Sequence, residues 1–185
     1  MRKTRYWFDT EFIEDGETID LISLGVVCDD GRELYVENSD ARLDRASDWV
    51  RENVLPHLWS QQRDKSEANR WVRDGGTGGL LSRQLIRATL LQFVDVGRYP
   101  PEFWAYYADY DWVVLCQLFG KMIDLPRDWP KFCLDVKQLQ YQLGTVLPQQ
   151  ESTEHHALED ARWTMQAWSA CRRDDARSRS HVVDP

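Results

Sequence analysis

The sequence lacks several features that would place it in particular classes. No apolar run approaches the ~20 residues that a membrane-spanning helix needs. The first residues are basic, and no apolar segment precedes the first strand-like run, so we expect neither a signal peptide nor membrane association. The four cysteines have no CxxC spacing. We therefore expect reduced thiols and a cytoplasmic location.

The chain also lacks an excess of positive charge. Its formal net charge is −8 at pH 7, whereas proteins that follow long duplex DNA by charge are usually basic. Any nucleic acid would therefore be engaged locally, through metals and stacking, at one short end. Tryptophan, in contrast, is abundant, with nine residues. Most should belong to the core or an interface, and some could serve as stacking platforms.

Apolar patterning predicts an α/β fold. Strand-like runs at 5–12, 18–28 and 32–37 are joined by short turns, which indicates an antiparallel meander. Helices and strands then alternate, and this favours a mixed β-sheet flanked by α-helices. The expected elements that follow the meander are helices over 44–54, 82–96, 109–119, 136–143 and 156–171, with strands over 103–107 and 132–134.

Two other segments have distinctive composition. The glycine-rich stretch 74–79 lacks the GK[ST] ending of a phosphate-binding P-loop, so we expect a mobile surface loop there. The segment 172–185 is strongly charged, and we expect it to be a disordered tail. No linker divides the remainder, so residues 1–171 should form a single domain.

The first strand contains two carboxylates, Asp9 and Glu11, among aromatic neighbours. Side chains two positions apart in a strand share a face, so both acids should point the same way. Burying two like charges together is costly unless a positive charge lies beside them. A divalent cation with oxygen ligands would meet that requirement.

Two later stretches could complete such a site. Asp109 and Asp111 lie where a strand meets a helix, and either could bind metal or only stabilise the helix start. Asp109 is placed to be the N-cap, and Asp111 is therefore the preferred ligand. Asp160 could face the same site from the last helix, or lie on its polar face. His155 could reach over the site from a loop, or be a solvent-exposed loop residue, and His156 is its alternative.

The three stretches together resemble the DEDDh family of 3′–5′ exonucleases. The matching residues are Asp-Thr-Glu-Phe from Asp9, Tyr-Asp-x-x-x-Leu around Asp111, and His-x-Ala-Leu-x-Asp-Ala from His155. The resemblance extends from Asp9 to about Met165, and it is greatest to the small mycobacterial-type 3′–5′ exoribonucleases. The sequence departs from the family at Tyr107, where an asparagine is often found.

The resemblance implies a ribonuclease H-like fold, with Asp9, Glu11, Asp111 and Asp160 as ligands of two Mg²⁺ or Mn²⁺ ions. It also implies that His155 acts as the general base, since imidazole accepts protons near neutral pH. The expected product is a nucleoside 5′-monophosphate, released from the 3′ end of single-stranded RNA or of an RNA overhang. The residues expected to hold the terminal nucleotide are Thr10, Glu11, Phe12 and Ile13.

Other readings remain open at this point. A 3′–5′ DNA exonuclease of the repair or proofreading type would carry the same motifs, because stacking does not read the sugar. A catalytically inactive nucleic-acid-binding module is an alternative of another class, although every expected catalytic position holds a competent residue. Small members of the family often pair, and a homodimer is therefore a further expectation.

Overall fold

The fold is built on one mixed β-sheet. The computed structural model describes residues 2–95, 97, 99–151 and 153–180. The sheet has six strands in the order β4-β3-β2-β1-β5-β6. The strands are β1 (Thr4–Glu14), β2 (Ile19–Cys28), β3 (Glu33–Asn38), β4 (Thr77–Leu81), β5 (Pro101–Ala105) and β6 (Leu134–Asp135).

The meander predicted from the sequence is confirmed. Strand β2 pairs antiparallel with both β1 and β3, whereas β4, β5 and β6 each pair parallel with their neighbours. Gly31 (φ +89°) supplies the left-handed turn between β2 and β3. Because side chains alternate along β1, Tyr6 and Phe8 point to one face of the sheet, and Trp7 and Asp9 point to the other.

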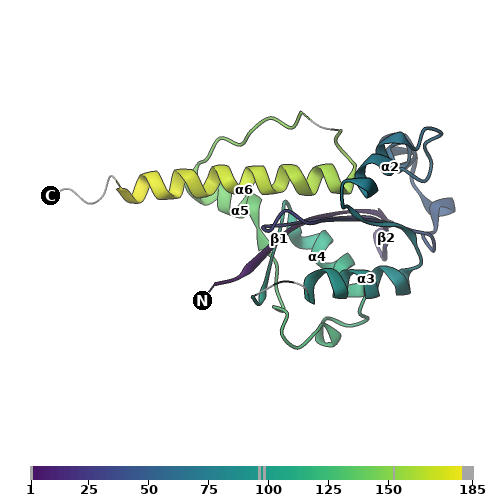
Figure 1. Ribbon diagram of the computed structural model, residues 1–185, viewed down its shortest axis with the longest axis horizontal. Coiled ribbons are helices and arrows are strands. Elements are labelled where there is room, and N and C mark those ends of the chain that lie inside the picture. Colours follow the sequence, from purple (N-terminus) through teal and green to yellow (C-terminus); the bar gives the residue numbers. More distant parts are fainter. Residues whose placement is uncertain (1, 96, 98, 152, 181–185) are drawn as a thin grey trace.

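Helices cover both faces (Figure 1). On the Tyr6 face, α3 (Arg83–Asp95) and α4 (Ala108–Gln117) pack against the largest apolar cluster. On the opposite face lies α6 (Ala157–Ser180), together with α1 (Asp48–Asn53) and α2 (Ser66–Arg73), and α5 (Val136–Leu143) packs on α6. Three short 3₁₀ helices complete the described chain: Leu43–Arg45, Leu55–His57 and Met122–Asp124.

Gly25 sets the position of α6. A Cβ at this glycine would meet the carbonyl oxygen of Ala157 at 2.2 Å, so only glycine lets the first turn of α6 lie directly on β2. Gly25 is the cross-strand partner of Asp9. The start of α6 therefore lies beside the acidic stretch of β1.

The prediction of a loop over residues 74–79 is wrong in part. Residues from Thr77 onward form β4, which pairs with the otherwise open edge of β3. Gly78 has φ +137°, and a Cβ there would meet the carbonyl oxygen of Tyr35 at 1.8 Å. The glycines therefore permit a close backbone approach at the sheet edge. The polar stretch before them contains helix α2, which was not predicted.

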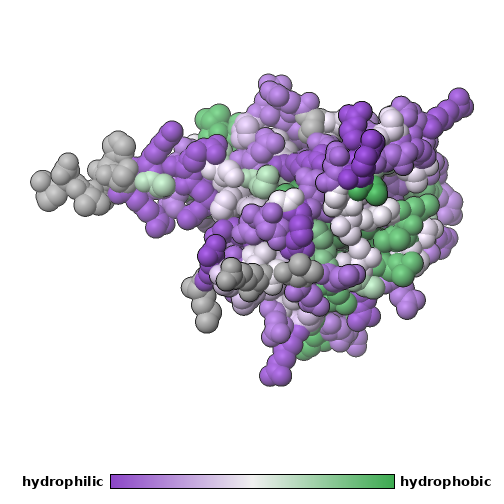
Figure 2. Space-filling model, in the orientation of Figure 1, coloured by the Kyte–Doolittle hydropathy of each residue, from purple (hydrophilic) through white to green (hydrophobic). Residues whose placement is uncertain are grey.

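The last helix continues to Ser180 instead of ending near Cys171, so the part of the expected tail from 172 to 180 is helical. Asp175 forms ion pairs with Arg172 and Arg179, one turn away on each side. This end projects beyond the sheet, and hydrophilic side chains surround it (Figures 1 and 2). Residues 181–185 lie outside the described residues. Within the described chain, no helix is both long and apolar enough to cross a membrane.

Candidate active site

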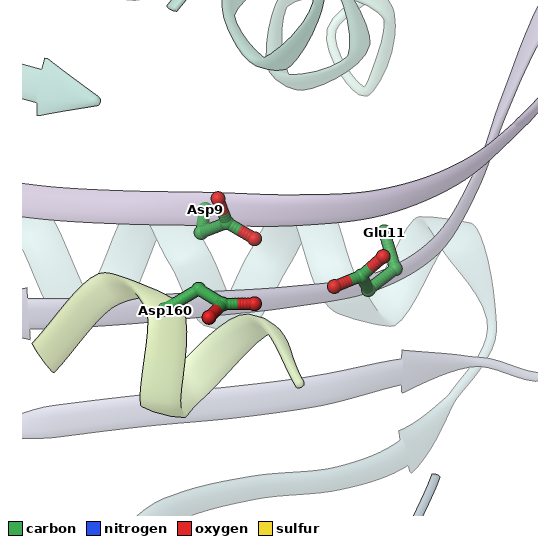
Figure 3. Close-up of side chains that lie close together, drawn as sticks. All are labelled: Asp9, Glu11 and Asp160. Carbon is green, nitrogen blue, oxygen red and sulfur yellow. The ribbon is translucent and has the colours of Figure 1, made fainter. Parts of the chain in front are cut away.

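Three carboxylates from two elements meet on one face of the sheet. Asp9 and Glu11 come from β1, and Asp160 comes from the first turn of α6. One oxygen of each lies within 4.8 Å of the others, and Figure 3 shows the three groups pointing toward one another. Residues about 150 positions apart in the chain thus form one acidic cluster. Alternation along β1 had predicted that Asp9 and Glu11 would share a face.

Asp111 approaches this cluster from α4. Its Oδ1 accepts hydrogen bonds from the backbone N–H of Thr10 (2.9 Å) and from the Thr10 hydroxyl (2.6 Å). Asp111 is buried and lines the same pocket as the cluster, whereas Asp109 is exposed and does not line it. Of the two aspartates left open by the sequence, Asp111 is therefore the one beside Asp9.

The predicted N-cap role of Asp109 is wrong. Helix α4 begins at Ala108, and Tyr107 occupies the N-cap position in a left-handed conformation. The acceptor for the Ala108 N–H is Asp135 Oδ2, at 2.9 Å, from the neighbouring strand. A carboxylate distant in sequence thus replaces the local cap.

Burial raises the pKa of Asp9, Glu11, Asp111 and Asp160, and neighbouring carboxylates add to the rise at the first three. Burial is the largest cause at Asp9, whose pKa is well above its usual range, and the charges of Asp111, Asp160 and Glu11 add to it. Burial followed by Asp160 raises the pKa of Glu11 to about 8. Burial also raises the pKa values of Asp111 and Asp160 to about 6, although hydrogen bonds from Thr10 and Gln150 oppose the rise. The folded chain therefore concentrates hard oxygen ligands at one buried position.

This chemistry fits divalent cations such as Mg²⁺ or Mn²⁺. Both ions prefer carboxylate oxygens, and their charge would relieve the repulsion that raises these pKa values.

The acids lie in a pocket of about 600 Å³. One part of its lining is acidic and includes Glu154 beside His155. The other part is aromatic: Phe12, Trp49, Tyr106, Tyr107, Tyr110 and Trp163. Phe12 and Tyr110 stack with ring centroids 5.9 Å apart. Of these rings, only Phe12 was expected at the site.

Gln150 is a further site residue that the sequence did not reveal. Its Nε2 donates to Asp160 Oδ1 at 2.5 Å, which fixes the orientation of this carboxylate. The residue lies in the irregular segment before α6, where sequence periodicity carries no signal.

The two adjacent histidines have different environments. His155 lines the pocket, has a left-handed backbone (φ +62°), and packs edge-on against Trp49 at 4.9 Å. His156 is buried between Tyr35 and Trp59, and burial lowers its pKa to about 4. Neither ring nitrogen of His156 has a hydrogen-bond partner among the described residues. The pocket therefore contains His155 and not His156.

Of the residues expected to hold a terminal nucleotide, three line the pocket: Thr10, Glu11 and Phe12. Ile13 does not. It is 5% exposed and packs with Ile22 and Val50 beneath α1. The register shift between Glu11 and Phe12 adds its extra residue to β2, so Ile13 stays on the face of Asp9 and Glu11, where the apolar cluster beneath α1 covers it. A contact of Ile13 with the last base is not supported by this position.

The order of the strands and the helices that flank the sheet define a fold class, the ribonuclease H-like fold. The Mg²⁺- and Mn²⁺-bound form of S. pombe Pop2p superposes with a TM-score of 0.53 at 13% identity, over 95% of this chain and 83% of that chain. The nuclease domain of 3′hExo, a DEDDh family member bound to rAMP, superposes with a TM-score of 0.52 at 11% identity, over 94% and 92%. At these identities the similarity establishes the fold, and it confirms the predicted class.

Sequence comparison gives the family. Residues 4–172 match the 3′-5′ exoribonuclease Rv2179c-like domain. Two curated Mycobacterium tuberculosis proteins, 3′-5′ exoribonuclease Rv2179c of strain H37Rv and MT2234.1 of strain CDC 1551, are each 42% identical over 160 residues. The aligned region covers 85% of this chain and 87% of each relative. The chain therefore belongs to the Rv2179c-like 3′-5′ exoribonuclease family, and the resemblance drawn from its motifs is confirmed.

Proposed function

We propose that the protein is a metal-dependent 3′–5′ exoribonuclease. It removes nucleoside 5′-monophosphates, one at a time, from the 3′ end of single-stranded RNA or of an RNA overhang. The observation that carries this proposal is the convergence of Asp9, Glu11 and Asp160, with Asp111 beside them, in one pocket. Membership of an exoribonuclease family supports RNA as the substrate.

The four carboxylates would hold two Mg²⁺ or Mn²⁺ ions. When bound, such ions supply a water of lowered pKa and stabilise the charge on the departing 3′ oxygen. Thr10 would keep Asp111 oriented through its two hydrogen bonds, and Gln150 would do the same for Asp160.

His155 would take the proton from the attacking water. Its ring lies against Trp49 at the wall of the pocket, which limits its rotation. The stacked pair of Phe12 and Tyr110 offers a flat apolar surface for the terminal base. Stacking of this kind does not select one base, so the enzyme should degrade RNA of varied sequence.

We also propose a cytoplasmic location and a homodimer. A cytoplasmic location is supported by the four cysteines, all of which are free thiols. A homodimer is supported by exposed apolar side chains such as Ile123, which is 79% exposed. Light scattering would test the second proposal directly.

A gel assay tests the activity. Single-stranded RNA labelled at its 5′ end is incubated with Mg²⁺, alongside a DNA of matched sequence and the Asp9→Asn variant. The proposal predicts a ladder that shortens from the 3′ end, no activity in EDTA, and none in the variant. Preferential shortening of DNA would favour a DNA exonuclease. A protein that binds RNA but leaves it intact would be a binding module.

A further inference from the structure

Tyr107 adopts an unusual backbone conformation. Its φ is +57°, and the only other non-glycine with positive φ among residues 2–95, 97, 99–151 and 153–180 is His155. Both residues line the pocket that holds the acids. Bulky side chains rarely occupy the left-handed region, and residues held there against this preference cluster at functional sites.

The conformation does not serve the packing of the core. The Tyr107 side chain is 62% exposed, and its ring touches Tyr106 edge-on at 4.8 Å. Asp135, from strand β6, instead holds the backbone directly after Tyr107. This carboxylate accepts the Ala108 N–H with one oxygen and the Gln138 N–H with the other, each at 2.9 Å. Asp135 thus fixes the starts of both α4 and α5 and keeps the Tyr107 ring displayed at the pocket.

A second hollow adjoins Tyr106, the neighbour of Tyr107 in the chain. This hollow of about 570 Å³ shares Tyr106 with the first, and its lining includes Lys137, Gln140 and Tyr141 from α5. Tyr141 is 84% exposed. Lys137 Nζ lies 5.8 Å from the centroid of the Tyr107 ring. Exposed aromatic faces beside a cation are the elements that bind single-stranded nucleic acid without reading its sequence.

We propose that Tyr107 stacks on the base of the penultimate nucleotide, immediately upstream of the scissile phosphate, and that Lys137 contacts a phosphate beside it. This inference rests on the proposed function. It also gives the path that the bound RNA strand follows away from its 3′ end. The strand would run from the acids, over Tyr107, into the hollow along α5. In a protein of net charge −8, the local cation opposes the general repulsion of the substrate.

The stacking is tested by a double-mutant cycle in which one change removes the Tyr107 ring and the other removes the penultimate base of the RNA. The Tyr107→Asn variant removes the ring while suiting the left-handed backbone, and Tyr107→Phe keeps the ring. Each is assayed on a pentanucleotide RNA with a normal penultimate nucleotide and on one whose penultimate nucleotide lacks its base. Phe132→Ala serves as the matched control, since Phe132 has a similar exposure (61%) and lines neither hollow.

With the normal RNA, Tyr107→Asn should raise KM about 5- to 150-fold with kcat little changed. This factor corresponds to the loss of one base–aromatic stack. Loss of the base should raise KM of the wild type similarly and leave that of Tyr107→Asn unchanged. Tyr107→Phe and Phe132→Ala should behave as the wild type. Equal effects of base removal on the wild type and on Tyr107→Asn would overturn the proposal.

The same cycle is measured as binding, by fluorescence anisotropy in an Asp9→Asn background. This readout does not need cleavage. If the wild type cleaves neither RNA, the proposed function fails, and the anisotropy cycle still decides whether Tyr107 stacks on the penultimate base.

Discussion

Thr10 donates two hydrogen bonds to a single oxygen of Asp111, one from its backbone N–H and one from its hydroxyl. The two residues are 101 positions apart in the chain, and both are buried. The bonds link β1, which carries two of the acids, to α4, which carries a third. Thr10 thus points to the α4 side of the sheet, although its neighbours Asp9 and Glu11 face α6. The strand supplies two carboxylates on one face and orients a third carboxylate from the opposite face.

The Thr10→Val variant tests this link. Valine keeps the shape and the backbone N–H but loses the hydroxyl, so the pKa of Asp111 should rise further and its hold on a cation should weaken. We expect Mn²⁺ affinity to fall about 10-fold, with a loss of about 1–2 kcal/mol in the free energy of unfolding. Titration calorimetry measures the first effect. Thr145→Val, a buried threonine outside the acidic pocket, is the control, and equal affinities of the two variants would refute the link.

The two aspartates at the start of α4 form a matched pair. Asp111→Asn should lower turnover by at least about 100-fold, because a ligand is lost from the buried site. Asp109→Asn, two residues away on the exposed side, should retain nearly the full rate. The initial rate of nucleotide release from RNA distinguishes them. Loss of activity in Asp109→Asn, with activity retained in Asp111→Asn, would reverse the assignment.

The adjacent histidines give a second pair. His155→Ala should reduce kcat about 10²- to 10⁴-fold, the usual contribution of a general base, while metal-induced stabilisation persists. His156→Phe should retain activity and stability, because the buried His156 ring packs among aromatic side chains and neither of its nitrogens bonds to a described residue. Rates and melting temperatures of both variants check this. A normal rate in His155→Ala would remove His155 from the mechanism.

The acidic cluster also predicts how stability depends on pH. The pKa of Glu11 rises from 4.5 to about 8 on folding, so the folded chain binds this proton more tightly than the unfolded chain. Stability is then greatest below pH 4.5 and declines as the pH rises toward 8. For the metal-free protein we expect the free energy of unfolding to fall by about 2–5 kcal/mol across this window.

Denaturant unfolding in EDTA at several pH values measures this dependence. Saturating Mg²⁺ should remove most of it, and Glu11→Gln should flatten the metal-free curve. A stability that increases between pH 4.5 and 8 without metal would show that these carboxylates are not buried together.

Sequence periodicity predicts the position of a side chain well where that position depends on a single strand or helix. The two-residue period of β1 placed Asp9 and Glu11 on one face. The helical pattern left Asp160 open between the site and the polar face, and the family resemblance assigned it to the site. The sequence favoured Asp111 over Asp109 for the wrong reason, because the start of α4 is held by Asp135 from another strand and not by Asp109. Long-range contacts of this kind leave no local pattern.

Other features depended on tertiary context in the same way. Strand β4 is rich in glycine, and it forms because β3 offers an open edge. Which of two consecutive histidines faces the pocket depends on one left-handed residue. Ile13 enters the core because α1 and the residues around it cover the end of β1. The helical extension beyond Cys171 was readable in part, since Arg172, Asp175 and Arg179 have the spacing of helical ion pairs.

The central claim is that these distant acids bind two catalytic cations, and a direct count of bound metal tests it. Mn²⁺ is titrated into the wild type and into Asp160→Asn, in the presence of a nucleoside 5′-monophosphate, and free ion is followed by electron paramagnetic resonance. We expect two ions per chain in the wild type and the loss of at least one in the variant. Unchanged stoichiometry and affinity in Asp160→Asn would contradict the claim.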